Sequence, residues 1–222
     1  MASELSRRRR RAPDRPGNVS YDYRSAVSTA NAVLLAGSKT FTITATDVAN
    51  NSTTQSGFSV TVDNTAPTAS DIQTTNVSAG TSGLAETWDT MVFTFAEPID
   101  PSSIVSGWNG TSRTVTLRIN NGGSSNDTVS VYDSADTTQL PLGSVNLGRK
   151  DYTGANIGFT NSTMVMSGSM ITLTLGTASS APTTAANTGS MIWTPSATAT
   201  DRAGNACSTT ARTETGTADK DF

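Results

Sequence analysis

The chain is predicted to be all-β, with antiparallel sheets packed as a sandwich. Apolar residues make up only 35% of its 222 residues and charged residues 15%, which suits a narrow two-layer core. Short segments alternate apolar and polar residues between turn-forming Gly, Asn, Asp and Pro. One phrase, TATDVANN at residues 44–51, returns as TATDRAGN at residues 198–205. Such a recurrence indicates an array of similar β modules.

The first 24 residues differ from the rest of the chain in charge. They contain seven arginines (Arg7 to Arg11, Arg15 and Arg24), whereas the whole chain carries a net charge of −3. We expect residues 1–24 to form a disordered basic leader. Nucleic-acid-binding domains carry positive charge on a folded face, so this distribution predicts no nucleic-acid partner. The sequence contains no long apolar run, so no membrane span is expected, and the leader lacks the apolar stretch of an export signal.

Residues 25–66 are predicted to be the C-terminal hairpin of an incomplete module. Two strands alternate apolar residues with Thr and Ser. In the first, one face carries Phe41, Ile43 and Ala45; in the second, the side chains expected to face the core are Phe58, Val60 and Val62. A lone hairpin is marginal in water. The segment is therefore expected to be disordered, docked on its neighbour or paired with another segment. Pro67 follows and predicts a short, stiff joint.

Residues 67–222 are predicted to form one complete β-sandwich module. Its expected strands contain Met91 to Phe95, Val115 to Ile119, Val129 to Tyr132, Met164 to Met166, Ile171 to Leu175, Met191 to Ala199 and Ala206 to Glu214. Between the first two strands, Asp100 is expected to cap a single helical turn in which Pro101 is the first residue.

The residue types present exclude several catalytic mechanisms. The chain has no histidine, which removes Ser–His and Cys–His nucleophile pairs and histidine metal sites. Cys207 is the only cysteine, so no intrachain disulfide can form, and its place in an expected strand predicts a small buried side chain. Glu97 and Asp100 flank prolines, and we interpret them as turn and cap residues rather than as an acid/base pair.

Three segments resemble bacterial immunoglobulin-like (Ig-like) repeats of the adhesin type, found in secreted or surface proteins of actinobacteria. TFTITATDVANN with VDNTAPT (residues 40–51 and 62–68) is similar to the closing hairpin and linker of such repeats. FTFAEPIDPSSI (residues 93–104) and TATDRAGNACST (residues 198–209) resemble further stretches of these modules. The resemblance implies an Ig-like β-sandwich, an extracellular or cell-surface location and no catalysis by the module.

Calcium is the principal ligand hypothesis. Hard cations bind several carboxylate, amide and backbone oxygens, and such residues gather at the hairpin tips and at the joint: Asp47, Asn50, Asp63, Asp201 and Asn205. The alternative is that these residues only form turns. No other cofactor is expected.

Three tryptophans are candidates for stacking on sugar rings. Trp108 lies between glycines in the SGWNG stretch and is expected to be the most exposed. The sequence as a whole predicts a non-catalytic structural or adhesion module, a stalk or spacer, beside neighbouring Ig-like modules and a surface protein or glycan partner. The alternative is a glycan- or protein-binding accessory module attached to a larger secreted enzyme.

Overall fold

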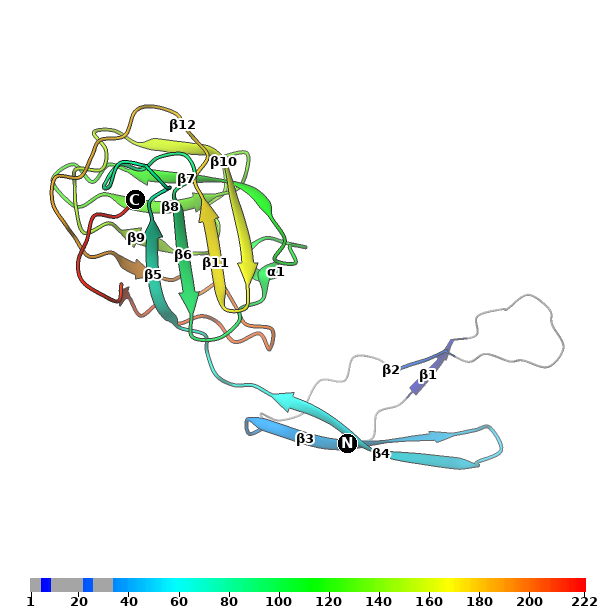
Figure 1. Ribbon diagram of the computed structural model, residues 1–222. Helices are drawn as coiled ribbons and strands as arrows, with labels where there is room; N and C mark the ends of the chain where they lie inside the picture. Colours follow the sequence, from blue (N-terminus) through cyan, green and yellow to red (C-terminus); the bar gives the residue numbers. More distant parts are fainter. Residues whose placement is uncertain (1–4, 9–21, 26–33) are drawn as a thin grey trace. The chain divides into compact units, whose positions relative to one another are not determined.

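The computed structural model describes residues 5–8, 22–25 and 34–222. These residues divide into two compact units. The boundary between them in the sequence lies between Asn64 and Thr65, and each unit is described by itself. Among the described residues, the regular structure is almost entirely β-strand, with a single four-residue helix, and every strand pairing is antiparallel (Figure 1). The all-β, antiparallel prediction is confirmed.

The first unit contains two separate strand pairs. Its strands are β1 (Leu5–Arg8), β2 (Asp22–Ser25), β3 (Gly37–Thr46) and β4 (Ser52–Val62). β1 pairs with β2, and β3 pairs with β4. Apart from these strand residues, the predicted disorder of residues 1–24 falls outside the described part of the chain.

The expected hairpin of the first unit is present, but its apolar side chains do not face a core. Phe41 and Phe58 stack at 5.5 Å between ring centroids, yet Phe41 is 45% exposed and Val60 52% exposed. A two-stranded sheet has no second layer to cover this face. The core-facing prediction for these strands is therefore wrong within the described residues.

The second unit is one curled ten-stranded sheet. Its elements are β5 (Ala69–Thr75), β6 (Thr90–Phe95), α1 (Pro101–Ile104), β7 (Arg113–Asn120), β8 (Thr128–Tyr132), β9 (Ser144–Asn146), β10 (Ile157–Ser167), β11 (Met170–Thr174), β12 (Thr177–Ala178), β13 (Ile192–Thr194) and β14 (Arg212–Thr213). The strand order is β14-β13-β9-β8-β7-β10-β11-β6-β5, with β12 paired to β10. The two ends of this path, β14 and β5, contact one another, so the sheet is nearly closed (Figure 1).

The curled sheet encloses an aromatic core. Trp193 on β13 is fully buried and meets Phe93 and Phe95 of β6 edge-on, at 5.1 and 4.8 Å between centroids. Its indole Nε1 donates to the Leu142 carbonyl at 2.7 Å. A buried Trp needs such an acceptor, because its N–H would otherwise be unsatisfied. Two facing walls of the sheet, β13 and β6, are thereby packed against each other.

Individual predictions within this unit are confirmed by the packing. Cys207 is a free, buried thiol, and burial together with the charge of Glu97 raises its pKa to about 11. Asp100 accepts the Ser102 N–H at 2.9 Å as the N-cap of α1, with Pro101 as its first residue. The thiol is therefore protonated at neutral pH, and Asp100 has a structural role.

Hydrogen bonds join β5 to the last residues of the chain and close the sheet. Ser208 N donates to the Pro67 carbonyl at 2.8 Å, and Thr215 N donates to Asp71 Oδ1 at 2.8 Å. Farther along, Phe222 N donates to Thr74 Oγ1 at 3.2 Å. Residue numbers rise together on both sides, so the two segments run in the same direction. We call this set of bonds, between residues 67–74 and 208–222, the terminal clamp.

Candidate functional site

The two copies of the repeated phrase fold into the same turn. In the first copy, Asp47 Oδ1 accepts the Asn51 N–H at 2.9 Å, and Asp47 Oδ2 accepts Asn51 Nδ2 at 2.9 Å. In the second, Asp201 Oδ1 accepts the Asn205 N–H at 2.8 Å, and Asp201 Oδ2 accepts Asn205 Nδ2 at 2.7 Å. The phrase therefore encodes a turn in which one carboxylate holds an Asn four residues later.

The partner of Asp47 is Asn51, whereas the sequence analysis had grouped Asp47 with Asn50. Asn50 has a φ of 64° and occupies the place of Gly204, whose φ is 92°. Both positions need a left-handed backbone, which Gly and Asn adopt at the lowest cost. Asn50 therefore acts through its backbone conformation, and Asn51 is the structural equivalent of Asn205.

Hydrogen bonding keeps both aspartates ionised. The bonds from Asn51 lower the pKa of the exposed Asp47. Burial opposes ionisation of Asp201, but the bonds from Asn205 and the turn backbone outweigh it and lower the pKa of Asp201 as well. Two ionised carboxylates at equivalent turns are consistent with both the structural and the cation-binding interpretation.

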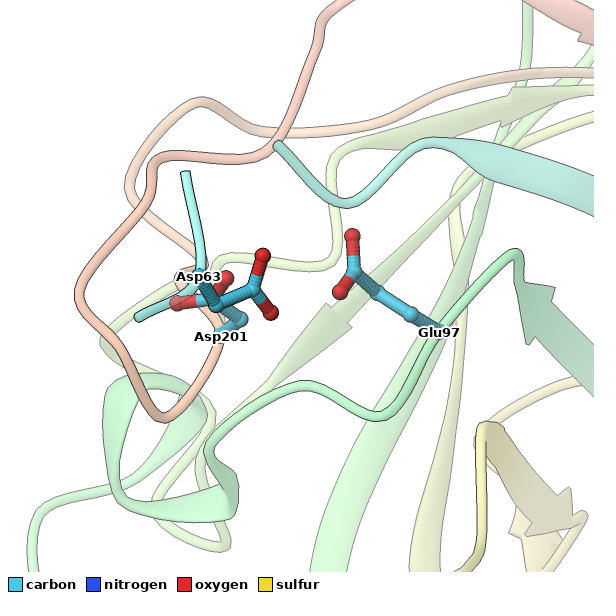
Figure 2. Close-up of side chains that lie close together, drawn as sticks. All are labelled: Asp63, Glu97 and Asp201. Atoms are coloured by element: carbon cyan, nitrogen blue, oxygen red, sulfur yellow. The ribbon is translucent and has the colours of Figure 1, made fainter. Parts of the chain in front are cut away.

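A second carboxylate lies beside the turn in the second unit. An isolated bridge between Ile99 and Asp201 brings the residues after β6 next to the repeated phrase. Carboxylate oxygens of Glu97 and Asp201 lie within 4.8 Å of one another, and Figure 2 shows the two side chains pointing toward the same space. Asp63, also labelled in Figure 2, follows β4 and belongs to the first unit. Two carboxylates at this spacing are suited to a hard cation such as Ca²⁺.

The sequence around Glu97 does not indicate a cation ligand. Its motif suggested only a turn, and Asp201 lies about one hundred positions away in the sequence. The long-range bridge between Ile99 and Asp201 brings the two together. The single local signal is the pair Glu97–Pro98, which follows the end of β6 after one residue, Ala96.

The exposure predicted for Trp108 is wrong. Its side chain is 5% exposed, and Nε1 donates to the Thr111 carbonyl at 2.6 Å. Gly107 and Gly110 have φ values of 73° and 93°, so they permit a tight loop that turns the ring inward. The flanking glycines therefore indicate a fold-back rather than exposure.

Trp88 is the exposed tryptophan instead. It is 68% exposed and has a φ of 80°, an uncommon backbone conformation for a bulky residue. The backbone N–H of Trp88 donates to the Leu175 carbonyl at 2.9 Å, and the backbone N–H of Leu175 donates to the Asp89 carbonyl at 2.8 Å. The adjacent Asp89 side chain is buried and accepts the Val77 and Glu86 amides at 2.8 and 2.7 Å. These bonds hold Trp88 at the surface in a fixed backbone conformation.

Comparisons with known proteins add no family assignment. No family model matches the chain, and no curated protein or solved structure is significantly similar to it. No helix in the described residues has both the length and the apolarity needed to cross a membrane.

The turn comparison predicts how Gly204 tolerates substitution. Gly204→Ala should lower the free energy of unfolding by about 1 kcal/mol, because a β-carbon disfavours the left-handed conformation. Gly204→Asn should cost less, since Asn occupies this place in the first copy. Urea denaturation of the two variants measures the difference. An Asn variant as unstable as the Ala variant would contradict the equivalence of the two turns.

Proposed function

We propose that this chain is a non-catalytic structural module, a stalk or spacer with an Ig-like β-sandwich, from a bacterial cell-surface or secreted protein. The terminal clamp is the observation that carries the proposal. A spacer in an array transmits force between the two ends of each module. The chain enters the second unit beside Pro67 and reaches Phe222 beside Thr74, at the two ends of β5 (Figure 1).

The two segments of the terminal clamp run in the same direction, and this determines how a pulling force acts on the hydrogen bonds between them. When parallel segments are pulled from opposite ends, their hydrogen bonds are loaded along the strands and share the force. Bonds loaded one after another, as in a peeled hairpin, break at lower force. The bonds to Pro67, Asp71, Gln73 and Thr74 lie along the whole length of β5. This arrangement supports a load-bearing role.

Further support comes from the repeated turn and from the resemblance to Ig-like repeats. The Asp–Asn turn recurs with the same four-residue spacing and the same pair of bonds in both units. A module built for repetition would reuse such a local element. Neighbouring Ig-like modules are accordingly the partners we propose, with a surface protein or glycan at the far end of the array.

Asp71 provides the mechanical test. Asp71 Oδ1 accepts the Thr215 N–H, and Oδ2 accepts the Thr215 hydroxyl at 2.9 Å. We expect Asp71→Ala to lower the unfolding force of the whole chain, pulled from its two ends in a single-molecule experiment, because the clamp loses its central bonds. Forced unfolding follows the unfolding rate rather than equilibrium stability.

Asp133 is a matched control for Asp71. It accepts the Thr137 N–H at 2.8 Å and the Thr137 hydroxyl at 3.1 Å, but it joins no part of the terminal clamp. Asp133→Ala should therefore leave the unfolding force near the wild-type value. Equal losses of force in the two variants would refute a load-bearing clamp.

Calcium binding at Glu97 and Asp201 is part of the same proposal, since a bound cation would stiffen this end of the second unit. Calorimetry of the whole chain should give a higher unfolding midpoint in calcium than in chelator. At about 100 times the Kd, binding to the folded state adds about 2.7 kcal/mol. Glu97→Gln should abolish the shift, and Asp100→Asn, a nearby cap substitution, should retain it. Identical midpoints in calcium and chelator would leave Asp201 as a turn residue only.

The exposure of Trp88 favours the second candidate function, a glycan-binding accessory module attached to a larger secreted enzyme. An exposed indole held by backbone bonds presents its face to a sugar ring at low entropic cost. Affinity electrophoresis in gels containing soluble cell-wall polysaccharides should show retardation that is lost in Trp88→Ala. Val165→Ala, which alters another exposed apolar side chain, should still be retarded. Identical migration of wild type and Trp88→Ala in every gel would exclude this function for Trp88.

A further inference from the structure

The segment Asp219–Phe222 docks into the second unit by buried contacts. Phe222 is 1% exposed and meets Tyr152 edge-on at 6.0 Å between centroids. Gly83 N donates to the Phe222 carbonyl at 2.8 Å, and Gly189 N donates to the Asp219 carbonyl at 2.8 Å. The segment therefore contacts β5 at Thr74 and also the loops that contain Gly83 and Gly189. Both loops are remote from residues 219–222 in sequence.

Asp221 is the buried acid at the centre of this contact. It is 0% exposed, and among the described residues the donors to its carboxylate are two hydroxyl groups: Tyr152 to Oδ2 at 3.1 Å and Thr74 to Oδ1 at 3.3 Å. A hydroxyl that donates to an ionised carboxylate normally lies at about 2.5–2.7 Å. The distances at Asp221 are longer than this, so its two hydrogen bonds stabilise the ionised carboxylate only weakly.

A buried acceptor next to Asp221 lacks a donor. Glu214, Asp219 and Asp221 have carboxylate oxygens within 4.8 Å of one another. The Met191 backbone and the Ser190 side chain bond to the Glu214 carboxylate, but its buried Oε1 atom has no hydrogen-bond partner among the described residues. A buried carboxylate oxygen without a donor is costly. A proton on one of these carboxyl groups would supply the missing donor and remove one of the mutually repelling charges.

The electrostatic surroundings also favour the protonated state. Burial, and then the charge of Glu214, raise the pKa of Asp221 to about 7, and burial raises the pKa of Glu214. Arg149, the cation beside Gly189, pairs with Asp151 at 2.7 Å instead. The other ionisable groups on the packed elements are Asp71 on β5, Lys220 beside Gly83, and Tyr152.

We propose that residues 219–222 form a proton-operated latch. A proton held between Glu214 and Asp221 keeps the segment docked. When this proton passes to solvent, the cluster becomes fully ionised, and undocking returns the carboxylates to water. Opening uncovers the Phe222 and Tyr152 rings and breaks the Thr74 end of the terminal clamp. The latch does not depend on the function proposed above, because it rests on the docked segment alone.

The sign of the pH effect follows from the raised pKa of Asp221. The docked state keeps its proton up to about pH 7, whereas the open segment loses it near the ordinary value of 3.8. Between these limits the docked state binds more protons, so docking weakens as pH rises. The opening equilibrium should increase by up to about tenfold per pH unit from pH 5 to 7 and should level off above pH 7.

Hydrogen exchange of the whole chain, followed by mass spectrometry of the peptide that covers residues 214–222, tests the latch. After correction for the intrinsic exchange rate, protection of this peptide should fall by up to about tenfold per pH unit between pH 5 and 7. Asp221→Asn keeps a neutral acceptor for Tyr152 and Thr74, so its protection should be nearly independent of pH. Asp133→Asn should behave like the wild type.

A second variant keeps the test decisive if Asp221→Asn folds poorly. Asp219 is exposed, and Asp219→Asn removes one repelling charge, so the loss of protection should be smaller and should level off at lower pH. Protection that is independent of pH in the wild type would overturn the latch. So would calcium that restores full protection at pH 7.5, because the cluster would then hold a cation rather than a proton.

Discussion

The curling of one sheet around Trp193 is the constraint on which the rest of the second unit depends. A chain with 35% apolar residues cannot fill a wide core, so the two walls of the sheet must lie close together. Trp193 spans the space between β13 and β6, and its N–H is satisfied by the Leu142 carbonyl. Once these walls meet, β14 comes to lie against β5 and the terminal clamp can form.

The buried carboxylates have different roles, which depend on the groups that donate hydrogen bonds to them. Asp127 is fully buried and accepts three backbone amides, those of Gly122, Tyr152 and Thr153, at 2.9–3.1 Å. Two amides likewise hold the buried Asp89. Asp221 is equally buried, but hydroxyl groups and other acids surround it. The amide donors fix Asp127 and Asp89 to neighbouring backbone segments, whereas the surroundings of Asp221 favour an acid that exchanges a proton.

The repeated phrase determines the turn in both copies but not the surroundings of the turn. Both copies form the Asp–Asn turn, because every bond in the turn is made within five residues. Their surroundings differ: Asp47 is exposed, whereas Asp201 is buried and lies close to Glu97. The repeated phrase thus gives an exposed hairpin tip in one unit and part of a carboxylate pair in the other.

The sequence by itself determined the central strands, the repeated turn and the helix cap, because alternation, positive-φ residues and capping act between neighbours in the chain. It did not determine the strands near the end of the chain: the expected strand from Ala206 to Glu214 is formed only at Arg212–Thr213. The strands containing Phe93, Leu117 and Leu173 and the cap at Asp100 were all predicted from such patterns. The tertiary structure alone decided the pairing of Glu97 with Asp201, the closure through Asp71 and the acid cluster around Asp221. It also decided which tryptophan is exposed. Each of these depends on segments that are remote in sequence, and the local pattern around Trp88 or Trp108 does not specify which side of the sheet the loop will face.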